Sequence, residues 1–295
     1  MLINKGISVF YFLKLIKWDA LAIFSYAVLM GSFDNHPFLK NIAIPFGLSA
    51  LVGTLLSLLL TFRTSQSYER WWEARVIWGA IVNDSRTLIR QLIEFIPTGN
   101  DRADFIQSFA NRQSIWCYTL ANTLRKTEMS PQVKAYCQEH SLQSDNLPNL
   151  LLTKHAKELS RLSEHYDLNA NKQTQIDTTL QRLTDSMGKC ERIKNTVFPR
   201  SYSILIHFLI YVFVTILPFG LQHNNPIVEI FLVTLTPILF ISIERTAILM
   251  QDPFENRPTD TPMTALSETI ERNLREMADL PVIPNTAPTT GYYVM

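Results

Sequence analysis

Long uncharged stretches limit what this chain can fold into more than any other feature. Residues 44–62 contain no charged side chain, residues 201–222 contain no Asp, Glu, Lys or Arg, and residues 226–243 contain only Glu229. A helix needs about 20 predominantly apolar residues to cross a bilayer. These three runs are therefore predicted to span a membrane, and the shorter run 18–33 is predicted as a fourth span.

The first seventeen residues precede the first predicted span. Lys14 and Lys17 interrupt their apolar pattern and no small-residue cleavage site follows, which argues against a signal peptide. We interpret residues 1–17 as an amphipathic helix on the membrane surface, with three apolar side chains turned toward lipid, Phe10, Leu13 and Ile16.

The distribution of Lys and Arg around the spans predicts their orientation. Residues 34–43 contain only Lys40 and residues 221–225 contain neither residue type, whereas the opposite ends of the spans carry many. Because Lys and Arg near span ends stay on the cytoplasmic side, both termini and the polar region 63–200 are predicted to be cytoplasmic.

The polar regions follow a helical pattern. Apolar residues between 63 and 200 recur at spacings of three and four, a loop is expected at 143–149, and a helix at 178–187 is expected to end at Gly188. After a break at 251–260, Thr261 and Pro262 are expected to cap and begin a terminal helix that runs to 277, and the tail 278–295 is expected to be irregular. The predicted fold is all-α, and its segments divide into an N-terminal surface helix (1–17), two spans (18–62), a helical cytoplasmic region (63–200), two further spans (201–250) and a C-terminal helix with its tail (251–295).

Composition and missing motifs exclude several functional classes. The net charge of +1 gives no basis for binding nucleic acid. Cys117, Cys137 and Cys190 lie too far apart for a disulfide framework or a C-x-x-C metal pair. The chain contains no G-x-G-x-x-G, no P-loop and no H-E-x-x-H. We therefore expect no enzyme activity, no cofactor and no metal site.

Polar residues within the second predicted span point to assembly. Ser49, Thr54, Ser57 and Thr61 are uncharged but polar, and polar side chains at membrane depth face protein or water rather than lipid. Self-association of the chain is the economical way to give them partners.

Four segments carry a resemblance to a known family. They are VGTLLSLLLTFRTSQSYERWWEARVIWGAIVNDSR at 52–86, GKCERI at 188–193, LPFGL at 217–221 and QDPFENRPTDTPMTALSETIERNLREM at 251–277. In these segments the chain resembles the bestrophin family, especially its bacterial and plastid branch. The resemblance implies a homopentameric channel for small monovalent ions in the bacterial inner membrane. Each subunit would supply four transmembrane helices, and the second of these would line a narrow central neck.

The F-R motif places the neck residues that the family implies. Rings four residues apart end at the Phe before the Arg, which gives Thr54, Leu58 and Phe62 on one helix face. Thr54 stands where the family usually has a bulky aliphatic residue. A register that follows the position of Pro45 would instead give a second set of rings, Leu51, Leu55 and Leu59, but the ungapped match around the motif favours the first set.

An apolar neck predicts gating by dewetting, because a narrow apolar tube empties of water and strips an ion of its hydration. Ring edges of Phe62 and the charge of Arg63 just below the neck would favour anions such as chloride. A monovalent cation channel, such as a sodium channel, of the same fold is the first alternative. The second is a membrane-anchored carrier or signalling protein.

The family also implies a second constriction at the cytoplasmic exit and, in its animal members, a calcium-binding clasp. Counting back from the C-E-R motif places the exit at Asn171, with Leu168 or Asn169 as alternatives. The clasp segment here contains Arg257 among its acidic residues, so calcium gating is not expected. The segment is expected to break the helix, and the terminal helix is expected to pack across a subunit boundary.

Overall fold

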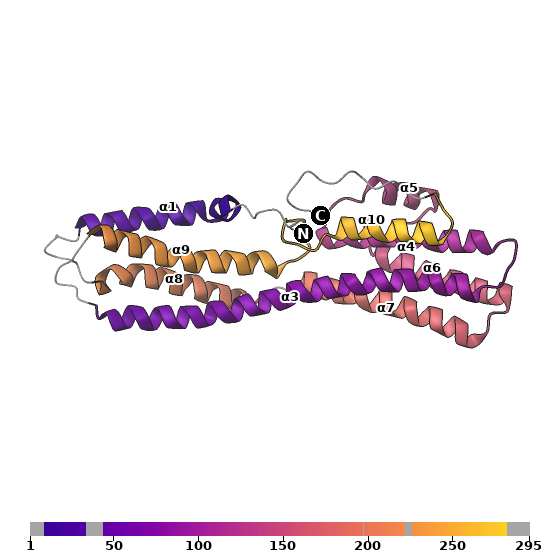
Figure 1. The fold of residues 1–295 in the computed structure, drawn as a ribbon, viewed down its shortest axis with the longest axis horizontal. Coiled ribbons are helices and arrows are strands. Elements are labelled where there is room, and N and C mark those ends of the chain that lie inside the picture. The colour runs from indigo at the N-terminus through magenta and orange to yellow at the C-terminus, as the bar shows by residue number, and fades with distance from the viewer. Residues whose placement is uncertain (1–8, 34–43, 197, 222–225, 282–295) are drawn as a thin grey trace. The chain divides into compact units, whose positions relative to one another are not determined.

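The computed structural model describes residues 9–33, 44–196, 198–221 and 226–281, and all regular elements in these ranges are helices (Figure 1). The chain divides into two compact units. One, here called the membrane unit, contains the described parts of 6–70 and 197–251, and the other, the polar unit, contains 71–196 and the described part of 252–295.

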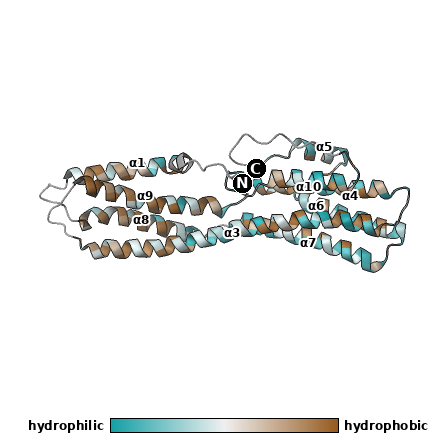
Figure 2. Ribbon diagram, in the orientation of Figure 1, coloured by the Kyte–Doolittle hydropathy of each residue, from teal (hydrophilic) through white to brown (hydrophobic). Residues whose placement is uncertain are grey.

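The membrane unit consists of α1 (Val9–Phe33), the first half of α3 (Phe46–Phe95), α8 (Arg200–Gly220) and α9 (Pro226–Gln251). All four helices are long and apolar enough to cross a membrane, which agrees with the four predicted spans, and their hydropathy contrasts with that of the polar unit (Figure 2). α1 packs against α9, and a Cβ atom at Gly31 would lie only 2.9 Å from the Ile230 side chain, so glycine permits this close approach. Leu56, Leu60 and Ile206 form part of the core of the unit.

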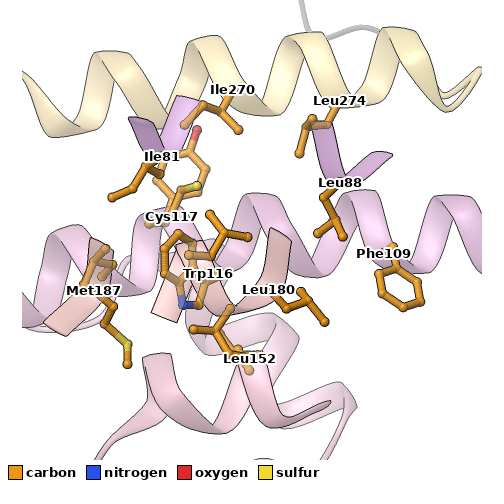
Figure 3. Packing of buried hydrophobic residues seen from close by; sticks show 14 of the residues in the cluster. Ile81, Leu88, Phe109, Trp116, Cys117, Leu152, Leu180, Met187, Ile270 and Leu274 are labelled. Carbon is orange, nitrogen blue, oxygen red and sulfur yellow. The ribbon is translucent and has the colours of Figure 1, made fainter. Parts of the chain in front are cut away.

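The polar unit combines the second half of α3 with α4 (Arg102–Arg125), α5 (Pro131–Glu139), α6 (Leu147–Tyr166), α7 (Ala170–Asn195) and α10 (Met263–Met277). α4 lies at its centre and packs against α5, α6, α7 and α10. The core between them includes Leu88, Phe109, Trp116 and Leu180 (Figure 3).

Cys117 and Cys190 are buried free thiols in this core, and burial raises the pKa of each to about 12. Cys137 is also a free thiol, so the prediction that the cysteines form no disulfides is confirmed.

Several predicted boundaries need correction. α7 passes through Gly188 and continues to Asn195, with Thr196 as its C-cap, so the predicted end at Gly188 is wrong. α6 already begins at Leu147 with Pro148 in its first turn, so only 143–146 of the predicted loop is non-helical. α10 begins at Met263, one residue later than expected.

The terminal helix packs closely within its own chain. Ile270 and Leu274 on its apolar face are fully buried in the core that α10 shares with α4 (Figure 3). Tyr118 on α4 donates a hydrogen bond to Glu271 at 2.8 Å, which fixes the two helices further. Packing of this helix across a subunit boundary stays a prediction.

Some predictions fall partly outside the described residues. Residues 1–8 of the predicted surface helix, the connections 34–43 and 222–225, and the tail beyond 281 are among them. Within the described part, α1 is continuous from Val9 to Phe33, so the predicted boundary between the surface helix and the first span lies inside one helix.

Candidate functional site

The first half of α3 has one buried side and one exposed side. Leu56 and Leu60 are fully buried, whereas Leu58 between them is 65% exposed. Because an α-helix turns about 100° per residue, Leu58 points roughly opposite to both leucines. The membrane unit therefore leaves one face of α3 uncovered.

The predicted row Thr54, Leu58 and Phe62 lies along this uncovered face, and all three side chains are exposed. The alternative row starts at Leu51 and Leu55, which are also exposed, but ends at Leu59, which is partly buried against the core. Both rows rotate by about 40° around the helix with each step of four residues. The first row has its middle residue, Leu58, at the centre of the open face, so its two ends stay on that face. The second row starts near the centre, so its last residue, Leu59, turns toward the core of the subunit. The geometry favours the first register.

Hydroxyl groups near this face are satisfied within their own helix. Thr54, Ser57 and Thr61 each donate to the carbonyl oxygen four residues earlier, at 2.8–2.9 Å. Ser49 is buried and donates to the carbonyl of Ile216 at 3.4 Å. Back-bonding to the helix thus supplies a hydrogen-bond acceptor for each of the three exposed hydroxyls, so these donors do not by themselves require a second subunit.

Arg63 does not lie on the uncovered face. Its side chain is 2% exposed and donates from Nη1 to Oε1 of Glu244 on α9 at 2.9 Å, and Glu244 is itself 1% exposed. His207 Nδ1 lies 3.3 Å from the same carboxylate oxygen. The predicted role of Arg63 as a positive charge flanking the neck therefore needs correction, because its charge points into the subunit and is balanced there.

Aromatic rings hold the end of the row beside this ion pair. The guanidinium of Arg63 lies 5.4 Å from the ring of Phe198, and Tyr202 packs against both Phe198 and Phe62 at centroid distances of 5.4 and 5.8 Å. The Tyr202 hydroxyl also donates to the carbonyl of Leu59 at 3.0 Å. These contacts link α8 to the turn of α3 that carries Phe62, so a movement of α8 would be transmitted to that turn.

The predicted exit residue lies at the start of α7 in the polar unit. Asn171 is exposed, and its backbone N–H donates to the side chain of Asn169 at 2.9 Å. Leu168 is buried in the core and Asn169 is engaged as the helix cap, so the structure favours Asn171 among the three candidates. The N-terminal turn of a helix carries a partial positive charge, which makes this position suitable for a passing anion.

The segment after α9 is held by basic side chains. Lys194 Nζ lies 2.6 Å from Oδ2 of Asp252 and 3.7 Å from Oε1 of Glu255, and Arg257 pairs with the other oxygen of Glu255. Asp260 Oδ2 accepts the backbone N–H groups of Glu255 and Arg257, each at 2.9 Å. The described residues contain no cluster of three or more acidic, His or Cys side chains arranged to hold a metal. The carboxylates of Asp252 and Glu255 are already paired with basic side chains.

Comparison with known proteins identifies the family of this chain. A profile of the bacterial and fungal bestrophin proteins matches residues 12–276, which is most of the chain. The chain belongs to the bacterial and fungal bestrophin family.

Individual bestrophin relatives agree with this assignment. The chain is 29% identical over 267 residues to the voltage-dependent anion channel-forming protein YneE of Escherichia coli, covering 89% of this chain and 86% of the relative. It is 28% identical to a voltage-dependent anion channel-forming protein of Ralstonia nicotianae, covering 82% and 80%. The crystal structure of a bacterial bestrophin homologue from Klebsiella pneumoniae superposes with a TM-score of 0.83 at 27% identity, covering 90% of this chain and 99% of that one. Together with its four long apolar helices, these relatives identify the chain as a membrane protein related to channels.

The bestrophin motifs located the row on α3 but missed the ion pair behind it. Glu244 is the key residue that sequence reasoning overlooked. One signal was present, since Glu244 follows a strongly apolar run and Arg63 follows another, and charged groups beside membrane spans tend to pair with each other. Nothing in the sequence, however, specified that the two helices pack together, because the partners are 181 positions apart.

Proposed function

We propose that this bestrophin forms a homopentameric channel that passes small monovalent anions, chloride among them, along the uncovered face of α3. The observation that carries the proposal is the uncharged exposed row of Thr54, Leu58 and Phe62 on a helix whose other side is buried. The names of its relatives, voltage-dependent anion channel-forming proteins, support an anion as the permeating ion.

The proposed neck controls flow through its wetting. Rings of Leu58 and Phe62 offer an ion no replacement for its hydration shell, so a narrow neck empties of water and blocks conduction. The hydroxyl of Thr54 is already bonded to its own helix, which leaves a smaller and less apolar ring at that level. Because aromatic ring edges carry partial positive charge, Phe62 would favour an anion over a cation in the open neck.

The proposed cytoplasmic aperture uses different chemistry. Amides of Asn171 at the start of α7 can hydrogen-bond to a passing ion, so this ring would sieve ions by binding them rather than by excluding water. Following the distribution of Lys and Arg, we place the aperture on the cytoplasmic side of a bacterial inner membrane, together with both termini.

A liposome flux assay tests the proposal. Purified protein should have the mass of a pentamer in mild detergent, and Leu58→Ala and Phe62→Ala should each raise chloride flux by widening and wetting the neck. Leu21→Ala, at an exposed apolar position on α1, is the matched control and should leave flux unchanged. A monodisperse monomer or dimer, or equal flux in all four proteins, would reject the proposed pore.

A further inference from the structure

Within the membrane unit, the basic and the acidic residues of α3 lie on different sides of the helix. Between Phe46 and Arg70 the helix carries three of them, Arg63, Glu69 and Arg70. Arg63 is buried against Glu244, and Arg70 is partly buried with its Nε donating to the carbonyl of Gln251 at 3.0 Å. Glu69 is exposed. Both basic groups are turned toward the protein, and the acidic group is turned away from it.

Glu69 lies on the same face of α3 as the proposed neck. It follows Phe62 by seven residues and Leu58 by eleven, which correspond to about two and three helical turns. Ser65, which is also exposed, lies on this face between Phe62 and Glu69. The uncovered face that begins with uncharged side chains therefore continues to a carboxylate.

The position of this carboxylate is restrained without being neutralised. Gln66 Nε2 donates to Oε2 of Glu69 at 3.1 Å, and Ser65 Oγ lies 3.5 Å from Oε1. Among the described residues no Lys, Arg or His side chain forms an ion pair with Glu69. Two neutral donors thus hold the group on the open face with its charge intact.

We infer that Glu69 forms a ring of fixed negative charge at the inner mouth of the neck and is the residue that limits the channel's preference for anions. The inference rests on the proposed function, since it requires this face of α3 to line the ion path. Seven residues of helix place Glu69 about 10 Å along α3 from Phe62. The Debye length at physiological salt is about 8 Å, so the field of each single charge is largely screened at the neck, and it is the sum over the ring that stays appreciable there.

The field of the ring predicts the direction of the change in selectivity. A ring of unit charges about 10 Å away attracts cations and repels anions with a free energy comparable to thermal energy after screening. Glu69→Gln should therefore raise the chloride-to-sodium permeability ratio about threefold, and Glu69→Lys should raise it further. Glu69→Asp keeps the charge and should stay close to wild type.

The test measures reversal potentials of the full-length channel in planar bilayers across a sodium chloride gradient, at high and at low salt. The shift caused by Glu69→Gln should grow as salt falls, because the Debye length lengthens to about 30 Å at 0.01 M. A purely structural effect of the substitution would not follow ionic strength. Glu164→Gln, which removes an exposed carboxylate on α6, is the matched control and should leave the ratio unchanged.

The outcomes separate this inference from the proposed function. If Leu58→Ala raises flux while Glu69→Gln and Glu69→Lys leave the permeability ratio unchanged at both salt concentrations, the pore stands and the role of Glu69 is overturned. If neither wild type nor Leu58→Ala conducts, the pore itself fails and the inference fails with it. A shift toward sodium in Glu69→Lys would also contradict the inference.

Discussion

The two halves of α3 differ in which kind of side chain they bury and which they expose. In the membrane unit the helix buries Arg63 and exposes Leu58, whereas in the polar unit it buries Trp78 and Leu88 and exposes Arg90. Among the described residues, only three exposed large hydrophobic side chains belong to the polar unit, Trp72, Val76 and Met129. The hydrophobic effect buries apolar side chains only where the surrounding solvent is water. The contrast therefore indicates that one continuous helix has its first half in a lipid environment and its second half in an aqueous one.

The units also differ in how they bury an ionisable group. The membrane unit pairs Arg63 with Glu244, so that neither charge is left alone. The polar unit buries His155 beside Phe109 at a centroid distance of 4.9 Å, and neither ring nitrogen has a hydrogen-bond partner among the described residues. Burial, together with the nearby charge of Arg112, holds the pKa of His155 well below its ordinary value. One unit thus keeps its buried charges and balances them, and the other keeps its buried group neutral.

The largest expected effect comes from removing one partner of the membrane-unit pair. Glu244→Gln leaves the buried guanidinium of Arg63 without a counter-ion and should lower stability by about 3–5 kcal/mol. The temperature at which the detergent-solubilised protein loses its size-exclusion peak measures the loss. The double variant Arg63→Leu with Glu244→Leu removes both charges and should recover most of it. Equal losses in the single and double variants would show that the pairing is unimportant.

The same substitution at two positions of α3 sharpens the contrast between its halves. Leu88 is fully buried in the polar unit, so Leu88→Ala should cost about 2–5 kcal/mol through lost burial and a residual cavity. Leu58→Ala, at an exposed position, should cost much less stability while raising ion flux. Thermal unfolding and liposome flux would be measured on both variants. A larger loss of stability in Leu58→Ala than in Leu88→Ala would contradict the comparison.

Acid should weaken the polar unit through His155. An unfolded chain binds a proton to this histidine below about pH 6.5, while the folded chain does not, so stability falls by about 1.4 kcal/mol per pH unit below that value. His155→Phe should remove this slope in thermal unfolding between pH 7 and 5. Burial raises the pKa of Asp260 to about 6, so this group adds stability to the folded chain as the pH falls, but it does so equally in the wild type and in His155→Phe. Parallel curves for the two proteins would refute the role of His155.

Calcium should have the smallest effect of all. Lys194 and Arg257 already occupy the carboxylates of Asp252 and Glu255, so micromolar calcium has no vacant ligand set there. Bilayer currents should be the same with calcium and with a chelator. Steep activation by calcium would show that the basic residues are displaced.

Sequence patterns predicted the apolar spans well because hydropathy is a local property. The predicted span 201–222 corresponds to α8, but the span 226–243 falls short of α9, which continues to Gln251. Hydropathy ends the span at Glu244, whereas the helix continues past it, because a glutamate lowers hydropathy without interrupting a helix, and its charge is paired with Arg63. The full length of α3 was not predicted, although no proline occurs between Pro45 and Pro97 to interrupt it.

The candidate site could be predicted only where it depends on position along one helix. The spacing of Thr54, Leu58 and Phe62 follows from helical geometry, and the structure places all three on one open face. The direction of Arg63 and Glu69 could not be predicted, because it depends on which helices pack against α3. A basic residue next to Phe62 therefore suggested a positive neck, while the structure exposes the acidic Glu69 instead.

If ions pass along the uncovered face of α3, chemical modification of that face in a conducting channel should alter the ion flux. A charged, water-soluble methanethiosulfonate should reach Leu58→Cys and change chloride flux strongly, because the new charge would stand in the neck. The same reagent on Leu21→Cys, which also replaces an exposed leucine but on α1, should leave flux at the wild-type level. Equal responses at the two positions, or no response at Leu58→Cys despite complete modification, would contradict the account.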